Sequence, residues 1–163
     1  MKKIPLTRGM VALVDDNDFE WLSQWKWYAV FSKGTYYAVR SHRNANGKRT
    51  SIKMHRQILD ITDSSIQVDH KNLNSLDNQR DNLRACTAVE NCRNRSVRIG
   101  TSQFKGVCWK KKHNQWVVRI RVNGRLIHLG YFKNEIEAAR VYDSMAIKLF
   151  GEFAATNQSM GLL

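Results

Sequence analysis

The sequence predicts an α+β protein made of small antiparallel sheets and short helices. Runs of aromatic and β-branched residues alternate with turn residues, which is typical of short strands. The dipeptides Asn46-Gly47 and Asn123-Gly124 are strong hairpin signals, while Thr87 to Glu90 and Asn134 to Glu137 are capping boxes that open helices. A length of 163 residues suits one domain, or equally two compact modules with an N-terminal extension.

The chain carries a strong excess of positive charge. Lys and Arg number 27 against 14 Asp and Glu, which gives a formal net charge of +13. Because such self-repulsion destabilises a compact protein without a polyanionic partner, we expect a nucleic acid. Residues 103–133 contain no carboxylate and eight basic side chains: Lys105, Lys110, Lys111, Lys112, Arg119, Arg121, Arg125 and Lys133. A basic run alone usually indicates a solvated surface, but this one lies within strand-like sequence.

The cysteines and the apolar runs exclude several classes of protein. Cys86, Cys92 and Cys108 are odd in number and lack zinc-finger spacing, so we expect reduced thiols and no structural zinc. No apolar run is long enough to span a bilayer, and the N-terminus has no signal-type apolar core. We therefore expect an intracellular protein that is not secreted and has no membrane partner.

Residues 1–50 are expected to form a small antiparallel sheet region. The acidic run Asp15 to Asp18 suits the start of a short helix that contains Phe19 and Leu22. Three strands are expected here: 25–30, 36–40 and 48–54. The three closely spaced tryptophans of this region are expected in the core and not as a platform for stacked bases.

Residues 51–95 are expected to have the order strand, loop, strand, helix. The parts are a strand at 66–69, an Asn-rich loop at 71–78, a strand at 82–86 and a helix opened at Thr87. A linker at 96–102 follows, because apolar periodicity stops before it.

Residues 103–157 are expected to form a C-terminal domain, with a tail at 158–163. Its elements are three antiparallel strands at 104–110, 115–122 and 125–132, and a helix from Asn134 to Gly151. Five apolar residues recur at helical spacing and are expected to face the sheet: Ile136, Ala139, Tyr142, Ala146 and Leu149. On the middle strand, Val118 and Ile120 alternate with Arg119 and Arg121, so one face suits the helix and the other suits DNA.

The central region holds the chemistry that phosphodiester hydrolysis needs, namely a general base and ligands for a cation that stabilises charge on the phosphate. His70 is the candidate base. The side-chain oxygens of Asp69 and Asn91 are hard ligands, and with water and phosphate they suit Mg²⁺ or a similar ion such as Mn²⁺. We expect these three side chains to converge on one cavity that is open to solvent.

Four matching segments follow one another in this region: Val68 to Asn72, Asp77 to Arg84, Thr87, and Glu90 to Asn91. This order resembles the HNH homing endonucleases of phages and mobile introns, which are ββα-metal nucleases. The resemblance implies metal binding by Asp69 and Asn91, activation of water by His70, and bracing of the loop by Asn82. The family often has His where this chain has Asn91, a substitution of the intron-type branch that keeps an oxygen ligand. His55 and Arg56 match the family's upstream His-Arg pair, where packing or phosphate contact would serve equally well, and Arg84 is a further secondary residue.

The C-terminal segments Phe104 to Val107, Trp116 to Arg121 and His128 to Phe132 resemble the AP2 domain, best known from plant transcription factors. The resemblance implies a three-stranded sheet in the major groove with a helix packed behind it. Arg119 and Arg121 are the first candidates for base contact, because Arg reads guanine through two hydrogen bonds. Further candidate DNA-binding residues are Lys105, Lys110, Arg125 and His128. Plant members commonly have Trp at the position of His128 and Arg at that of Cys108, so their target sequence does not carry over.

The predicted architecture is an N-terminal antiparallel sheet, a central ββα-metal HNH fold, and a C-terminal AP2 sheet packed on one helix. The predicted function is a metal-dependent, homing-type endonuclease that cuts double-stranded DNA in the cytoplasm or nucleoid of a bacterial or phage-infected cell. No protein partner is implied. Two alternatives stay open at this point: a DNA-binding regulator without catalysis, and a ribonuclease or RNA-binding factor, since basic charge does not distinguish DNA from RNA.

Overall fold

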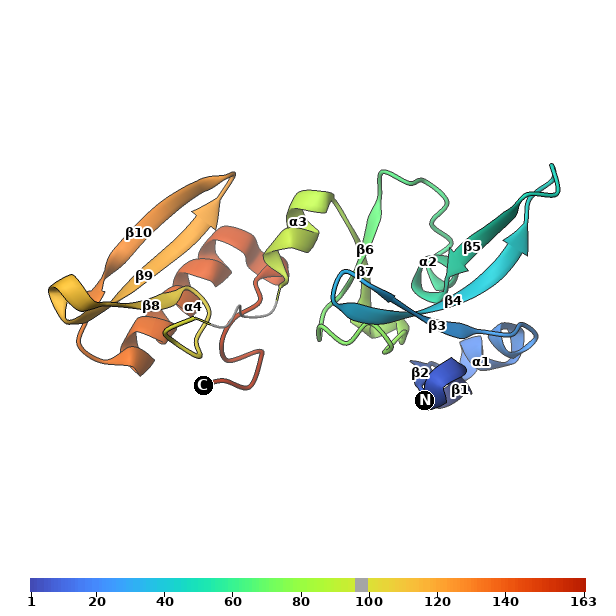
Figure 1. Cartoon of the computed structure of the whole chain (residues 1–163), viewed down its shortest axis with the longest axis horizontal. Helices are drawn as coiled ribbons and strands as arrows, with labels where there is room; N and C mark the ends of the chain where they lie inside the picture. The colour runs from blue at the N-terminus through green and yellow to red at the C-terminus, as the bar shows by residue number, and fades with distance from the viewer. Residues whose placement is uncertain (96–99) are drawn as a thin grey trace. The chain divides into compact units, whose positions relative to one another are not determined.

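A computed structural model of the chain describes residues 1–95 and 100–163. These residues form two compact units, Met1–Ala88 and Val89–Leu163. The strands (Figure 1) are β1 Lys2–Pro5, β2 Val11–Val14, β3 Tyr28–Ser32, β4 Thr35–Arg43, β5 Arg49–Lys53, β6 Gln67–His70, β7 Leu83–Cys86, β8 Val107–Lys110, β9 Gln115–Val122 and β10 Arg125–Phe132. The helices are α1 Asp16–Ser23, α2 Met54–Ile58, α3 Ala88–Arg93 and α4 Glu135–Phe150. Within the predicted linker at 96–102, residues 96–99 lie outside the described residues.

The first unit contains three small antiparallel sheets. β1 pairs with β2, β4 lies between β3 and β5, and β6 pairs with β7. One hydrophobic core joins these sheets with α1 and α2, through residues such as Val14, Leu22, Met54 and Leu83. The domain boundary proposed at residue 50 lies inside β5, so the residues on its two sides share this core.

The strand predicted at 25–30 begins later than expected, at Tyr28. The indole N–H of Trp27 donates instead to the carbonyl of Leu22 at 2.8 Å, near the end of α1, where helix carbonyls lack partners. Trp21, Trp25 and Trp27 stack edge to face, with ring centroids 5.9 and 6.4 Å apart. Because Trp27 is buried and the other two pack against the core, the prediction that the tryptophans belong to the core is confirmed.

The second unit is a three-stranded antiparallel sheet, in the order β10-β9-β8, with α4 packed on one face (Figure 1). The predicted bounds of β9 and β10 are confirmed. β8 begins later than predicted, at Val107, because Phe104 packs into the core and Gly106 turns the chain with φ +78°. Asn134 caps α4 as predicted, with its side chain accepting from two backbone N–H groups.

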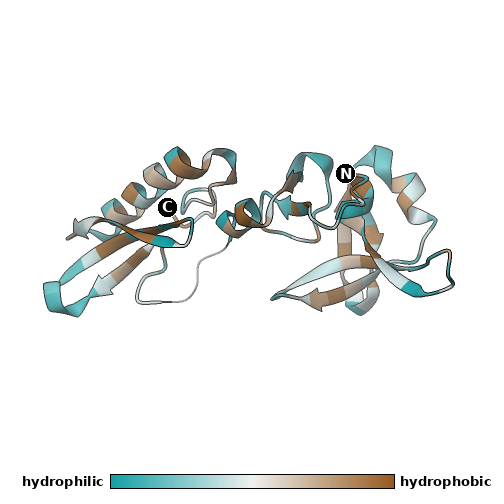
Figure 2. Cartoon of the chain, turned by 90° about the horizontal axis from the view of Figure 1, so that it is seen from above, coloured by the Kyte–Doolittle hydropathy of each residue, from teal (hydrophilic) through white to brown (hydrophobic). Residues whose placement is uncertain are grey.

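The apolar stripe predicted for α4 is partly wrong. Ile136 and Leu149 are exposed, with 48% and 39% of their surface in solvent. The face that meets the sheet carries Ala138, Ala139, Tyr142, Ala146 and Phe150. Small alanines let the helix approach the sheet closely, and this shifts the buried face away from the larger Ile136 and Leu149. Figure 2 shows hydrophobic and hydrophilic residues alternating along this helix.

The C-terminal segment folds back onto α4 through buried polar side chains. Asp143 lies on the buried side of α4, and its carboxylate accepts from the backbone and side-chain amides of Asn157 at 2.7 and 2.8 Å. Asn157 in turn bonds to the backbone of Lys105 in both directions. These bonds satisfy Asp143 and Asn157 in the interior. In the described part of the chain, no helix has the length and apolar character needed to cross a membrane.

We expect Gly106→Ala to destabilise the second unit strongly. A Cβ at Gly106 would lie 1.9 Å from the ring of Tyr142, on a backbone with φ +78°. Overpacking and the strained φ together cost about 2–4 kcal/mol. Urea unfolding of the full chain measures this loss.

Gly124→Ala is the matched control, because Gly124 also has a positive φ, +81°, but nothing within 4 Å of the added Cβ. It is expected to cost only about 1 kcal/mol, the strain term alone. Equal losses in the two variants would contradict the close packing of Gly106 on Tyr142.

Candidate active site and candidate DNA-binding face

Asp69 and His70 are the last two residues of β6, and the pairing of β6 with β7 positions them. Asp69 lies opposite Arg84, and His70 lies opposite Leu83. Successive side chains of a strand point to opposite faces, so the two residues enter different surroundings. Both are buried, with only 4% of Asp69 and 6% of His70 exposed.

The structure brings Asp69 together with Arg84, which the sequence marks only as a secondary residue. Two nitrogens of the Arg84 guanidinium, Nε and a terminal one, donate to Asp69 Oδ2 at 2.9 and 2.6 Å. Both side chains are buried, and removing one partner of such a pair costs about 3–5 kcal/mol because a charge is left uncompensated. Arg84 therefore fixes the position of the Asp69 carboxylate.

His70 lies in a cluster of rings. The imidazoles of His70 and His55 on α2 are perpendicular, with centroids 5.1 Å apart. Tyr37 on β4 lies 5.6 Å from His55 and 6.5 Å from His70. Nε2 of His70 is 3.5 Å from Oδ1 of Asn78, at the outer limit of a hydrogen bond.

Burial lowers the pKa of both imidazoles. Desolvation, with a smaller contribution from the charge of His70, lowers the pKa of His55 to about 2. Desolvation also lowers the pKa of His70, against the opposing effects of Asn78, Asp69 and Asp77. Both rings are therefore neutral at pH 7, and a neutral imidazole is the form that accepts a proton.

The surroundings of His70 differ from the solvent-open cavity that the sequence predicts. Tyr37 from β4, His55 from α2 and Asn78 from the loop before β7 lie around the ring. Tyr37 and His55 come from segments more distant along the chain, whereas Asn78 belongs to the loop that follows His70. The motif around His70 contains no signal for the packing of Tyr37 against it.

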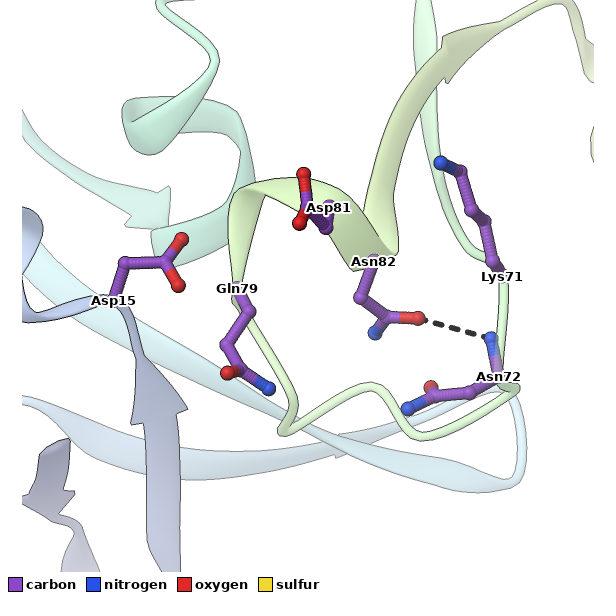
Figure 3. A pocket seen from close by; sticks show the side chains of 6 residues that line it. All are labelled: Asp15, Lys71, Asn72, Gln79, Asp81 and Asn82. Atoms are coloured by element: carbon purple, nitrogen blue, oxygen red, sulfur yellow. Dashed lines mark hydrogen bonds between the residues drawn. The ribbon is translucent and has the colours of Figure 1, made fainter. Parts of the chain in front are cut away.

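Asn82 closes the loop between β6 and β7 (Figure 3). Its Oδ1 accepts from the backbone N–H of Asn72 at 3.0 Å, and its Nδ2 donates to the carbonyl of Asp77 at 2.7 Å. One side chain thus holds two parts of the loop, as bracing requires. The loop borders a shallow hollow of about 450 Å³, lined by Asp15, Lys71, Asn72, Gln79, Asp81 and Asn82. Asp69 and His70 do not line this hollow.

Asn91 lies on α3 in the second unit, whereas Asp69 and His70 belong to the first. Its approach to Asp69 stays a prediction. The predicted donor set of one carboxylate and one amide oxygen has the hard-ligand chemistry that Mg²⁺ and Mn²⁺ prefer. Within residues 1–95 and 100–163, no three His, Cys, Asp or Glu side chains are grouped to hold a metal ion, so this site would depend on water and phosphate for its other ligands.

Arg56 contacts the backbone of the segment that leads into β6. Its two terminal nitrogens donate to the carbonyls of Ile66 and Asp63, both at 2.6 Å. Of the two roles considered for the upstream pair, the structure shows a packing contact for His55 and a backbone contact for Arg56. Sequence reasoning missed Tyr37 and Asn78, because Tyr37 was only one residue of a predicted strand and Asn78 was one of several asparagines in the loop.

Arg119 and Arg121 lie on the face of the second unit's sheet that is opposite α4. Val118 and Ile120, which alternate with them on β9, are buried against the helix. Arg121 donates to the carbonyl of Gly124 in the turn between β9 and β10, at 2.9 Å. His128 lies opposite Arg119 in the sheet register. Lys110 ends β8 and Arg125 begins β10.

This face also has an aromatic patch that strand alternation does not predict. Val117, between the arginines and the start of β9, is fully buried, and its cross-strand neighbours are Cys108 and Tyr131. The ring of Tyr131 lies 4.9 Å from that of His113 and 4.7 Å from that of His128. Basic and aromatic side chains therefore lie next to each other on the face that is expected to meet DNA.

Lys105 has a different partner from the one the sequence suggests. Its ammonium donates to the backbone carbonyls of Arg93 and Arg95, at 3.0 and 2.7 Å. The contact of Lys105 with DNA stays a prediction, whereas its contact with the end of α3 is observed.

The sequence model of the AP2 domain family matches residues 102–152, which contain β8, β9, β10 and α4. The AP2-like ethylene-responsive transcription factor PLT2 of Arabidopsis thaliana is 45% identical over 60 residues, and the corresponding factor CRL5 of Oryza sativa subsp. japonica is 43% identical over 60 residues. Each alignment covers 36% of this chain, and they cover 11% and 9% of the two plant proteins.

A longer similarity extends over both units. The uncharacterized HNH endonuclease L560 of Acanthamoeba polyphaga mimivirus is 33% identical over 145 residues. This alignment covers 86% of the present chain and 75% of the viral protein. Similarity to an HNH endonuclease is therefore not confined to the short motif around His70.

Acid is expected to destabilise the first unit through His55. Its pKa is 6.5 in a model peptide and about 2 in the folded protein, so below pH 6.5 the unfolded chain binds a proton that the folded chain does not. The stabilisation is complete above pH 6.5 and falls by about 1.4 kcal/mol per pH unit toward pH 2. Urea unfolding at pH 7 and pH 5 measures the loss.

His55→Phe is the control, because it keeps an aromatic ring and removes the titrating group. The variant is expected to lose less stability than the wild type between pH 7 and pH 5. An identical loss in both proteins would show that His55 does not cause it.

Proposed function

We propose that this chain, which belongs to the HNH endonuclease family and carries an AP2 domain, is a metal-dependent, homing-type endonuclease that cuts duplex DNA near a site read by that domain. The observation that carries the proposal is that His70 directly follows, at the end of β6, an Asp69 carboxylate that Arg84 holds in place. A base and a carboxylate at adjacent positions are what metal-assisted hydrolysis of a phosphodiester needs.

In the proposed mechanism, His70 is the general base. Its imidazole takes a proton from a water molecule while the water oxygen bonds to phosphorus. The bond from phosphorus to the 3′ oxygen breaks, and that oxygen is protonated from solvent, which gives 5′-phosphate and 3′-hydroxyl ends. Asp69 and Asn91 would hold Mg²⁺ or Mn²⁺, which when bound stabilises charge on the phosphate and the leaving oxygen. Arg84 orients Asp69, and Asn82 braces the loop that follows His70.

The burial of His70 is compatible with this role, because a general base needs to reach only one water molecule and not the DNA strand itself. The same burial favours a second candidate, a DNA-binding regulator in which the nuclease fold is only a scaffold. Incubation of supercoiled plasmid with the protein and Mg²⁺ separates the two: nicked or linear plasmid supports the nuclease, and intact bound plasmid supports the regulator.

The AP2 sheet is proposed to read the DNA in the major groove. Arg119 and Arg121 project from the face opposite α4 and are assigned to base edges, where Arg forms paired hydrogen bonds with guanine. Lys110, Arg125 and His128 are assigned to positioning on the backbone, because they lie at strand ends or across from the reading residues. Lys105 is not included in this set, since its ammonium bonds to two backbone carbonyls and the residue is only partly exposed, whereas Arg121, which bonds to one carbonyl, is exposed.

Fusion of the two activities in one chain raises the effective concentration of the nuclease near the preferred sequence. A weak nuclease linked to a specific reader cuts where the reader binds, without contacts of its own to the bases. The relative from a giant virus supports a role on DNA inside an infected cell, and we extend this to bacterial or phage hosts as part of the proposal.

His70→Ala is expected to abolish plasmid cutting and to leave the affinity for duplex DNA unchanged. Loss of a general base lowers the rate about 10²–10⁴-fold. Cutting is followed on agarose gels with Mg²⁺, and binding by fluorescence anisotropy with Ca²⁺. His42→Ala, at the exposed end of β4, is the control and should cut normally. Cutting by His70→Ala, or by the wild type in excess chelator, would refute the mechanism.

Arg119→Ala and Lys110→Ala are expected to weaken DNA binding in different ways. Loss of a base contact costs about 1–3 kcal/mol and relaxes the preference at one base position. Loss of a phosphate contact weakens binding to all sequences alike and reduces the slope of log affinity against log salt by about 0.9. Selection from a random duplex library and a salt titration measure the two effects. Unchanged selectivity in Arg119→Ala would exclude Arg119 as a base reader.

A further inference from the structure

α3 has too few residues to be stable by itself. It spans Ala88–Arg93, whereas isolated helices in water are marginal even at about 12–15 residues. Its order therefore depends on contacts with the rest of the protein. All of α3 except Ala88 belongs to the second unit, so the helix that carries Asn91 is part of the body that contains the AP2 domain.

Lys105 binds the C-terminal end of this helix. Its Nζ donates to the carbonyl of Arg93, the last residue of α3, at 3.0 Å, and to the carbonyl of Arg95 at 2.7 Å. The last carbonyls of a helix lack intrahelical partners and carry the negative end of its dipole, so a cation is favoured there. A second contact joins α3 to α4, because the guanidinium of Arg93 lies over the ring of Phe150 at 5.0 Å.

Lys105 is itself held by Asn157, a buried residue of the C-terminal segment that follows α4. Its backbone N–H donates to Asn157 Oδ1 at 2.6 Å, and its carbonyl accepts from Asn157 Nδ2 at 3.3 Å. Asn157 is bonded to Asp143 on α4. The next residue, Gly106, lies against the Tyr142 ring and leaves no room for a side chain. A continuous series of hydrogen bonds therefore runs from α4 through Lys105 to the end of α3.

We propose that Lys105 is a positioning residue that attaches α3, and with it Asn91, to the AP2 domain, so that the DNA-reading unit carries part of the nuclease's metal site. This inference rests on the proposed function, in which Asn91 is a metal ligand. Desolvation lowers the pKa of Lys105 to about 8, against the attraction of Asp143, which agrees with an ammonium withdrawn from solvent. Cutting is then registered to the sequence that the AP2 domain binds, because one of the metal ligands moves with that domain.

Three variants of the full chain test the attachment. Lys105→Met keeps the aliphatic stem and removes the ammonium, and Lys105→Arg keeps a charged donor. Lys112→Met removes the same charge from an exposed turn between β8 and β9. Each protein is examined by amide hydrogen exchange, by DNA affinity across a salt series, and by mapping of the cut positions on a selected duplex.

In Lys105→Met, exchange at residues 91–95 is expected to accelerate about tenfold or more, because hydrogen bonds to a charged donor are lost. Exchange at Val118 and Ile120 stays slow, which shows that the AP2 domain still folds. The cut positions of Lys105→Met on the selected duplex are expected to be more widely scattered than those of the wild type. Lys105→Arg and Lys112→Met are expected to exchange in α3 like the wild type.

The salt series separates attachment from a phosphate contact. The slope of log affinity against log salt is expected to be unchanged in Lys105→Met, whereas a phosphate contact would reduce it by about 0.9. A reduced slope, or unchanged exchange in α3, overturns the proposal. If Lys105→Met does not fold, Arg93→Gln removes the contact with Phe150 and should accelerate exchange in α3 in the same direction; no acceleration there also overturns it.

The outcomes distinguish this inference from the proposed function. Faster α3 exchange in Lys105→Met, in a chain whose wild type does not cut DNA, upholds the attachment and refutes the nuclease. Normal cutting by the wild type with unchanged α3 exchange and unchanged cut positions in Lys105→Met upholds the nuclease and refutes the attachment.

Discussion

The buried ion pair between Asp69 and Arg84 is the interaction on which the candidate active site depends. β6 and β7 have only four paired positions, and a slip of one residue would turn every side chain to the opposite face. The two bonds from Arg84 to Asp69 oppose such a slip, because each shifted register would leave a buried charge without a partner. The same register places His70 beside His55, where burial keeps both imidazoles neutral. One ion pair therefore fixes the carboxylate directly and the base indirectly.

Local sequence patterns predicted those parts of the fold that local interactions determine. The Asn123-Gly124 turn and the Asn134 cap gave the bounds of β9, β10 and the start of α4, since the necessary contacts lie within a few residues. The predictions from sequence are wrong or incomplete where a contact with a residue distant along the chain determines the local structure. β3 begins only at Tyr28, directly after Trp27, whose indole donates to the carbonyl of Leu22 in α1. Similarly, motif spacing selected Asp69, His70 and Asn82 as candidates, but Tyr37 reaches His70 from another sheet, and no local pattern contains that contact.

Net charge predicts the kind of partner better than it predicts which side chains touch it. The run of eight basic residues between 103 and 133 correctly directed attention to the AP2 domain. Within that run, Arg119 lies on the face of the sheet opposite α4, whereas the ammonium of Lys105 donates to backbone carbonyls at the C-terminal end of a helix. A lysine near a helix C-terminus has a competing electrostatic partner inside its own chain. A count of charges treats these side chains as equal, and only their contacts in the structure show which of them already have partners within the chain.

A basic nuclease has to avoid cutting wherever its charge attracts DNA. Nonspecific association with the phosphate backbone is strong for a chain of net charge +13, and the base contacts proposed for the AP2 sheet have to compete with it. In the proposed function, the residue assigned as a metal ligand, Asn91, belongs to the same unit as the AP2 sheet, so reading and cutting are linked through that unit. Coupling of this kind is reciprocal: if DNA on the AP2 sheet favours completion of the metal site, metal at that site must favour DNA on the sheet by the same factor. Specific cutting would then follow from the attachment of α3, without any base contact by the nuclease itself.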